Sequence, residues 1–343
     1  MDRKQFSVAT FNLFNLQDAG KAMYGDAVWT EDQFRNKAWW IAWQLETLEP
    51  DIVGLQELWS KTALEKVLAA GSEKLRQQYD VLAKPATGKA IVCGALVRKG
   101  LLIGEPQWVE KFPNAVRLQL KEDPDDPQSP RINVTINRFS RPVLNFQVTL
   151  RQDEPATEVF VAHLKSKLPT RIDEEAWFEA DPEKYRPHQT ALGAAISTIR
   201  RTAEAVGLRV MLTTLMKETT TPVIVLGDIN DGQHSNTANI LTEQPRYLVG
   251  EAEGGADNGL YTAQTLQEYR DTRDVYYTYV HQDLRESLDH VLVSEQFYDN
   301  SRKRRWLFDG LVINNDHLNF DNHKEVGTGD HGVVKVSFKH DPA

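Results

Sequence analysis

The stretch VIVLGDIND, residues 223 to 231, joins four apolar residues to a group of polar ones. The apolar part is typical of a strand that is buried on both faces. Asp228, Asn230 and Asp231 then follow within four positions of one another. One polar residue at the end of a strand is ordinary, so this stretch alone does not define a site.

Five more strand-like segments carry an amide, a carboxylate or an imidazole at one end. In layered α/β proteins ligands gather at strand ends, so six polar strand ends together indicate one shared site. The other residues at these ends are Asn12 after VATF, Glu57 in IVGLQE, His163 after EVFVA, Asp289 and His290 in SLDHVLV, and Asp330 and His331 in GDHGVVKV.

These residue types suit the hydrolysis of a phosphoester. Hard oxygen donors bind Mg²⁺ or Mn²⁺, which keep coordination positions for water and for a substrate phosphate. A carboxylate near the ion can orient or deprotonate an attacking water. An imidazolium can stabilise charge on a phosphoryl oxygen, and a second carboxylate can hold that imidazole in place.

Other common site patterns do not occur in the sequence. The segment that begins at Asp228 starts like an EF-hand loop, but Gly232 stands at its third ligand position and Asn239 at its twelfth position. There is no HExxH helix, CxxC pair, Walker loop, GxGxxG or serine nucleophile elbow. The residues therefore favour metal-assisted hydrolysis.

Helical periodicity separates several of the strand-like segments. It predicts helices over residues 31–49, over residues 60–78 with Ser60 as N-cap, and from His188 to about Lys217.

Polar segments at 121–131 and 250–259 predict exposed loops, with a strand from Arg131. Strand pairs occur together with strand–helix–strand units. This mixture predicts two covered sheets, an α/β layered sandwich, in a single domain over residues 1–343.

Six ordered blocks resemble the signature of the endonuclease/exonuclease/phosphatase family. They are VATFNLFNL, DIVGLQELW, VFVAHLKSK, VIVLGDIND, SLDHVLVS and GDHGVVKV, and the match runs from residue 8 to 338. The resemblance implies a four-layered α/β sandwich of two mainly antiparallel sheets flanked by helices, as in deoxyribonuclease I. It also implies hydrolysis of phosphoesters that depends on Mg²⁺ or Mn²⁺.

The resemblance implies a metal-binding group within the site. Glu57 would be the principal metal-binding carboxylate, with Asn12 beside it, and Asp330 would face the ion.

The resemblance also implies a catalytic group. Asp228 would orient or deprotonate the water, and Asn230 would hold the phosphate and the surroundings of the metal. His163 would contact the phosphate. His331 would contact it too and stabilise the transition state, with Asp289 as its orienting partner.

The segment HLKSK places Lys165 and Lys167 beside His163, and with Arg171 they could hold flanking phosphates. The alternative is a solvated basic turn. HLKSK and GDIND together resemble bacterial nucleases of the family more than its inositol phosphatases. We therefore expect a nuclease with a DNA or RNA partner. The alternatives are a phosphatase for a small phosphorylated metabolite or lipid headgroup, and a non-catalytic binding protein.

Aromatic and basic residues elsewhere could also contact nucleic acid. Trp39 and Trp43 lie four apart and are expected in the core, whereas an exposed aromatic of the same segment could stack on a base. SRKRRW at 301–306 is the only dense basic run, and it is either a backbone contact or solvated surface.

Composition restricts the remaining possibilities. A formal net charge of −9 argues against gripping nucleic acid by bulk electrostatics, but it permits binding through a metal and a local basic patch. The single cysteine, Cys93, excludes a disulfide framework and suits a reducing compartment. We see no signal peptide and no apolar segment near the ~18 residues that span a bilayer. The expected location is the cytoplasm, with no membrane partner.

Overall fold

The computed structural model describes residues 2–84, 91–123, 125, 128–247, 257–272, 277–320, 322–323 and 325–343. Most of the loop predicted at 250–259 lies outside the described residues.

Two six-stranded sheets form the centre of the fold. The first contains β1 (Gln5–Leu16), β2 (Ile52–Leu58), β3 (Tyr79–Leu82), β4 (Val92–Arg98), β15 (Trp306–Asn314) and β16 (Val333–His340). The second contains β5 (Leu102–Lys111), β8 (Arg138–Val148), β9 (Thr157–His163), β10 (Val223–Asp228), β11 (Tyr261–Thr262) and β14 (Asp289–Val293). Two short hairpins are β6 (Leu118–Leu120) with β7 (Ile132–Val134), and β12 (Tyr279–His281) with β13 (Leu284–Glu286).

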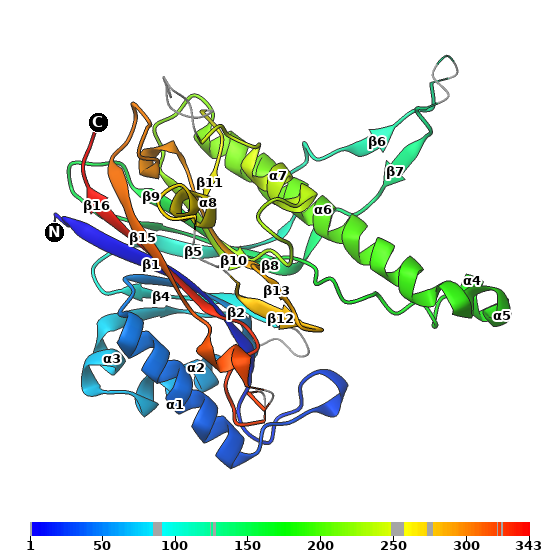
Figure 1. Ribbon diagram of the computed structural model, residues 1–343, viewed down its shortest axis with the longest axis horizontal. Helices are drawn as coiled ribbons and strands as arrows, with labels where there is room; N and C mark the ends of the chain where they lie inside the picture. Colours follow the sequence, from blue (N-terminus) through cyan, green and yellow to red (C-terminus); the bar gives the residue numbers. More distant parts are fainter. Residues whose placement is uncertain are drawn as a thin grey trace.

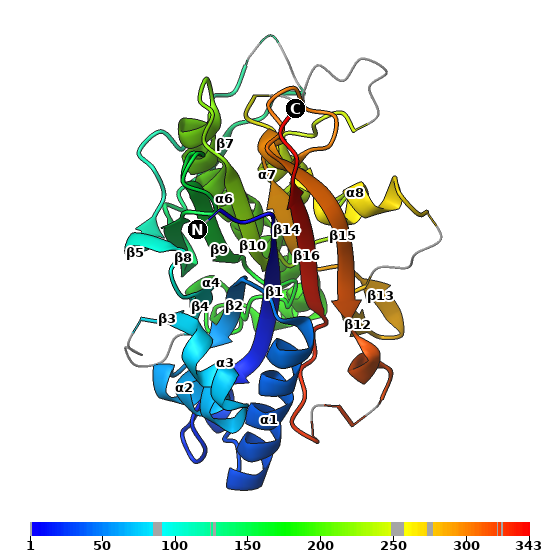
Figure 2. The same cartoon turned by 90° about the vertical axis from the view of Figure 1, so that its left-hand side faces the viewer.

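The strand order is β15-β16-β1-β2-β4-β3 in the first sheet and β11-β14-β10-β9-β8-β5 in the second. Each sheet has one parallel pair, β1 with β2 and β9 with β10, and its other neighbours are antiparallel. Figure 2 shows β1 and β16 side by side.

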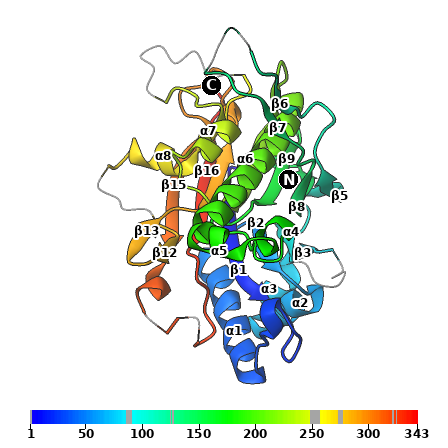
Figure 3. The same cartoon turned by 90° about the vertical axis from the view of Figure 1, so that its right-hand side faces the viewer.

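Helices cover the outer face of each sheet, which gives four layers (Figure 1). The first sheet is covered by α1 (Glu31–Leu48), α2 (Lys61–Ala70) and α3 (Glu73–Gln78). The second is covered by α6 (Gln189–Met216) and α7 (Asn236–Thr242), and Figure 3 shows α6 lying across it. The predicted four-layered sandwich of two mainly antiparallel sheets is confirmed.

The described residues also form shorter helices. They are α4 (Ala176–Glu179), α5 (Pro182–Tyr185), α8 (Ala263–Glu268) and four 3₁₀ turns at Tyr24–Asp26, Arg186–His188, Glu295–Phe297 and Asp316–Asn319. None of the described helices has the length and apolar character that crossing a membrane requires.

The helix predictions are confirmed for α1 and α6, but the predicted helix over 60–78 is two helices. Ser60 caps α2, since its side chain accepts a hydrogen bond from the Ala63 amide at 3.2 Å. Gly71 ends α2, and Ser72 caps α3. The Gly-Ser pair therefore stops one helix and starts the next. The strand expected from Arg131 begins one residue later, as β7.

The prediction that Trp39 and Trp43 lie in the core is wrong, since they are 61% and 46% exposed. Trp40 between them is buried, as is Trp29. A spacing of four residues fits any face of a helix, and the buried face of α1 is set instead by Phe34, Ala38, Ile41 and Leu45.

Alternation along the strands divides the apolar side chains between layers. In β1, Phe6 and Val8 face the space between the sheets, and Ala9 and Phe11 face the helices of the first sheet. The series that faces between the sheets continues in β1 to Asn12, which is fully buried.

Three neighbouring strands of the second sheet also carry an apolar series that faces between the sheets and has a polar residue at one end. Their apolar series between the sheets end in His163 on β9 and Asp228 on β10, and start from Asp289 on β14. In the sheet register Asp228 is the direct partner of both His163 and Asp289. The polar strand ends therefore meet at one edge between the sheets, and both chain termini lie at the opposite end (Figure 1).

Candidate active site

A pocket of about 590 Å³ opens at this edge. Its lining contains eight of the ten predicted site residues, namely Glu57, His163, Lys165, Lys167, Asp228, Asn230, Asp330 and His331. The other two, Asn12 and Asp289, are fully buried and hydrogen-bond to Asp228 and His331. The structure therefore brings the whole predicted set together.

Asp228 lies at the centre of the site. Its Oδ2 accepts a hydrogen bond from Asn12 Nδ2 at 3.1 Å, and its Oδ1 accepts one from the Asn230 amide at 2.9 Å. The same Oδ2 is 3.5 Å from His163 Nε2 and 3.9 Å from His331 Nε2. Burial raises the pKa of Asp228 to about 7, although His331 opposes the rise.

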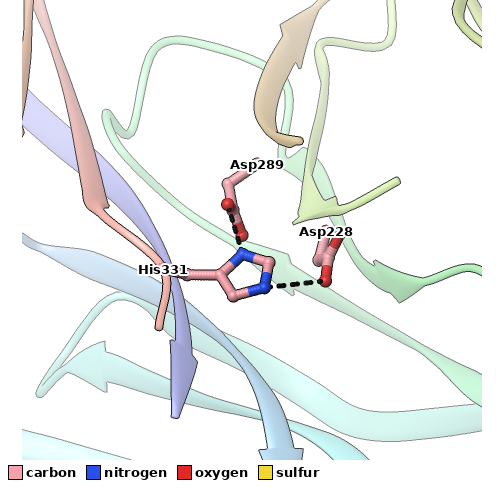
Figure 4. Close-up of side chains that lie close together, drawn as sticks. All are labelled: Asp228, Asp289 and His331. Atoms are coloured by element: carbon pink, nitrogen blue, oxygen red, sulfur yellow. Dashed lines mark hydrogen bonds and ion pairs between the residues drawn. The ribbon is translucent and has the colours of Figure 1, made fainter. Parts of the chain in front are cut away.

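His331 and Asp289 form a close pair, shown in Figure 4. His331 Nδ1 lies 2.8 Å from Asp289 Oδ2. Burial alone would lower the pKa of His331, but Asp289 and Asp228 together hold it well above its ordinary value. The Nδ1–H of the resulting imidazolium donates to Asp289, and the Nε2–H points toward Asp228.

His163 has the opposite electrostatic character. Burial, with Arg141 adding to its effect, lowers its pKa well below the ordinary value. Asp228 therefore lies between the neutral imidazole of His163 and the charged imidazole of His331. Both can donate a hydrogen bond, and the charged one can also stabilise negative charge.

Glu57 reaches the site through an irregularity in β2. The alternation of that strand would place Glu57 on the helix side, with Val53 and Leu55. A β-bulge between Leu55 and Leu58, with a left-handed φ of 58° at Glu57, turns the side chain into the pocket. Burial and then the nearby Asp330 raise the pKa of the Glu57 carboxyl.

Asn15, which was not predicted from the sequence, fixes this carboxylate to the surrounding structure. Its backbone N–H donates to Glu57 Oε2 at 3.0 Å. Its carbonyl oxygen accepts from Trp29 Nε1 at 2.8 Å, and its Oδ1 accepts from Trp59 Nε1 at 2.9 Å. Asn15 has a left-handed φ of 55°, which Asn tolerates better than most residues. The second Asn in FNLFN, beside a strand end, was the available signal.

Lys37 of α1 lies buried close to this group. Its Nζ is 5.0 Å from the ring centre of Phe14 and 4.9 Å from that of Trp29. Among the described residues no hydrogen-bond acceptor contacts the ammonium group. Burial lowers the pKa of Lys37 to about 7, and Asp330 and Glu57 oppose this effect.

The pocket has a cationic side that is larger than predicted. Arg141 on β8 lines it beside Lys165 and donates to the Leu164 carbonyl at 3.1 Å. Burial lowers the pKa of Lys165, and Arg141 contributes to that shift. Arg141 was not among the residues predicted from the sequence, and it lies within β8.

Other basic residues do not join this group. Arg171 pairs with Asp173 and Glu174 at 3.1 and 3.0 Å and is largely exposed. The run at 301–306 precedes β15, whose first residue pairs with His340 at the far end of β16. The basic run is therefore at the opposite end of the sheet from His331.

Asp231 and His290 have structural partners. Asp231 accepts from Thr237 Oγ1 at 2.7 Å and pairs with Arg201 at 3.3 Å. His290 Nε2 lies 2.9 Å from the Asp231 carbonyl oxygen and 3.0 Å from that of Ser287. These contacts hold the chain after β10 in place.

The profile of the Endonuclease/Exonuclease/phosphatase family matches residues 9–331, so the chain belongs to this family. Its members are metal-dependent phosphoester hydrolases. No curated protein matches the sequence.

Solved structures share the fold at low sequence identity. D. rerio TDP2 in complex with a single strand DNA product is 15% identical, with a TM-score of 0.54 and 98% of this chain and 100% of that chain covered. The human Nocturnin catalytic domain with bound sulfate is 13% identical, with a TM-score of 0.53 and coverage of 99% and 96%. A mannosyl-6-phosphatase of Bacteroides thetaiotaomicron is 15% identical, with a TM-score of 0.51 and coverage of 97% and 99%.

The contacts of Asn15 predict that it supports metal binding by Glu57. Loss of a group that orients a ligand typically costs about 10–100-fold in metal affinity. Asn15→Ala keeps the backbone N–H that donates to Glu57, but it removes the Oδ1 that Trp59 holds and places Ala at a left-handed φ. We therefore expect this variant to weaken Mn²⁺ binding about tenfold in isothermal titration calorimetry, and Trp59→Phe to weaken it less. Trp108→Phe is the control, because that indole donates to the Cys93 carbonyl instead. An Asn15→Ala variant with wild-type Mn²⁺ affinity would show that Asn15 supports only the local fold.

The burial of Lys37 predicts an unusual dependence of stability on pH. Its folded pKa of about 7 lies below its ordinary value of 10.5, so between these values the folded state binds fewer protons than the unfolded state. Its contribution to stability therefore increases as pH rises through this window. We expect Lys37→Met to raise the free energy of unfolding by roughly 1–4 kcal/mol at pH 7, with a smaller gain at pH 10.

Urea denaturation at both pH values measures this difference, and Lys61→Met on the exposed surface of α2 is the control. A loss of stability in Lys37→Met that is equal at both pH values would contradict the prediction.

Proposed function

We propose that the chain is a divalent-metal-dependent phosphodiesterase, a nuclease that cleaves DNA or RNA phosphodiester bonds by attack of water. It would act as one domain over residues 1–343. The observation that carries this proposal is the Asp228 carboxylate between the His163 and His331 imidazoles, in a pocket with Arg141 and Lys165 on one side. A water molecule beside Asp228 would then lie next to a substrate phosphate that the cationic groups hold.

Glu57, Asn12 and Asp330 would hold the Mg²⁺ or Mn²⁺ ion. Their donors are oxygens, which these ions prefer. Burial and the nearby Asp330 raise the pKa of the Glu57 carboxyl, which means that the charged carboxylate is poorly stabilised. A bound cation would stabilise it, and the raised pKa therefore supports this assignment. When bound, such an ion polarises a phosphoryl oxygen.

A second group of side chains could also hold a metal. Ligand atoms of Asp228, Asp289 and His331 lie within 4.8 Å of one another. The Nδ1 atom of His331 is already hydrogen-bonded to Asp289, however, and the imidazolium repels a cation. We therefore favour Glu57 as the principal metal ligand.

The remaining residues would act on water and phosphate. Asp228 would orient the water and take its proton, since a carboxylate with a pKa of about 7 is a suitable base near neutral pH. His331, held by Asp289, would stabilise negative charge on the phosphoryl oxygens. His163 would contact the phosphate in its neutral form. Asn230, whose Nδ2 donates to the Leu164 carbonyl at 3.1 Å, would help to hold the phosphate.

A nucleic acid substrate is supported by the cationic side of the pocket. Arg141 and Lys165 could bind a phosphate next to the reacting one. TDP2, which has a similar fold, was solved with a single strand DNA product. A phosphatase for a small phosphoester is the second candidate, because a mannosyl-6-phosphatase also shares the fold.

A substrate panel tests this proposal. Purified protein with Mg²⁺ or Mn²⁺ would be incubated with single-stranded DNA, duplex DNA, RNA, bis-p-nitrophenyl phosphate and inositol phosphates. We expect cleavage of a polynucleotide, no cleavage by Asp228→Asn, and a loss of about 10²–10³-fold in His331→Ala. Phosphate release from monoesters alone would favour the phosphatase. Full activity in excess EDTA would contradict metal dependence.

A further inference from the structure

The two lysines of the cationic side have different partners. Lys165 Nζ donates to the neutral oxygens Ser166 Oγ and Leu168 O, each at 3.3 Å. Lys167 Nζ lies 2.6 Å from Glu286 Oε1 and 3.6 Å from Asp231 Oδ1. The charge of Lys165 thus remains available to an anion, whereas two carboxylates already face Lys167.

Glu286 is fixed relative to the centre of the site. It ends β13 and is the register partner of Tyr279 on β12. Tyr279 in turn forms a β-bridge with His331, and the ring centres of the two residues are 4.9 Å apart. Glu286 and Lys167 both line the pocket. The Glu286 carboxylate is therefore presented to Lys167 from the side of His331.

The pair contributes little to the stability of the fold. The side chains of Lys167 and Glu286 are each 40% exposed, and ion pairs this exposed are typically weak. A substrate phosphate could displace the Glu286 carboxylate from Lys167 at a small cost in free energy. The displaced carboxylate would still lie nearby and repel the phosphate. The position of Glu286 therefore has a larger effect on anion binding than on folding.

We propose that Glu286 is a specificity-determining residue that occupies the place of a substrate phosphate on Lys167. This inference rests on the proposed phosphodiesterase function. The site would accept a neighbouring phosphate at Arg141 and Lys165 and disfavour another at Lys167. The substrate class is then a phosphodiester at the end of a chain or in a short fragment, with a neighbouring phosphate at Arg141 and Lys165 and none at Lys167.

The test compares two substrates in each variant. The readout is kcat/KM for single-stranded decathymidylate divided by kcat/KM for bis-p-nitrophenyl phosphate, which has no neighbouring phosphate. We expect Glu286→Gln to raise this ratio about three- to tenfold, since it removes one charge next to the second phosphate. The increase should largely disappear at about 0.5 M salt, where exposed charges are screened.

Two variants control this comparison. Asp309→Asn removes the same charge from the Lys339 pair, which has a similar distance of 2.6 Å and similar exposure but lies outside the pocket. It should leave the ratio unchanged. Lys167→Met combined with Glu286→Gln should return the ratio toward the wild-type value, because the freed lysine is the source of the gain.

Failure of the inference differs from failure of the proposed function. A ratio in Glu286→Gln within 1.5-fold of wild type, or below it, would overturn the inference while the activity itself stands. If no substrate is cleaved, fluorescence anisotropy of labelled decathymidylate makes the same comparison by binding. Tighter binding in Glu286→Gln than in wild type and Asp309→Asn would support the role of Glu286, and equal binding would overturn it.

Discussion

The structure depends on a concentration of buried negative charge between its two sheets. Asp228 and Asp289 face each other in register, Glu57 approaches from the other sheet, and burial raises the pKa of both Asp228 and Glu57. Placing carboxylates in such a medium costs free energy unless positive charge or hydrogen bonds compensate. The His331 imidazolium, the Asn12 amide and the Asn15 backbone amide provide part of this compensation. The divalent cation that we propose at Glu57 would offset the remaining deficit.

The strands around the site position these buried polar side chains. The parallel pair β9–β10 and the antiparallel neighbour β14 set three polar side chains in one row across the second sheet. The first sheet supplies Asn12 from β1 and Glu57 from β2, which are also parallel neighbours. Because strand register is fixed by apolar series that pack between the sheets, the large core positions a small polar site. Lys37 and the two indoles on Asn15 extend this support to the helix layer.

The sequence predicted the parts of the site that follow the regular alternation of strands. Asn12, His163, Asp228 and Asp289 each belong to an apolar series with a period of two, and the layered fold follows from the same series. Glu57 does not, because a bulge turns it to the other face, and it was predicted from its place at a strand end and from the family resemblance. Arg141 was not predicted, because it lies inside β8 and not at a strand end. Asn15 and Lys37 act through contacts with segments distant in sequence, which local patterns do not reveal.

We propose that Glu57, and not the Asp228–Asp289–His331 group, is the principal metal ligand. Anomalous diffraction at the manganese edge from crystals grown with Mn²⁺ tests this most directly. We expect an anomalous peak within bonding distance of a Glu57 carboxylate oxygen, with the hydrogen bond between His331 Nδ1 and Asp289 intact. A peak enclosed by Asp228, Asp289 and His331, with none at Glu57, would contradict it.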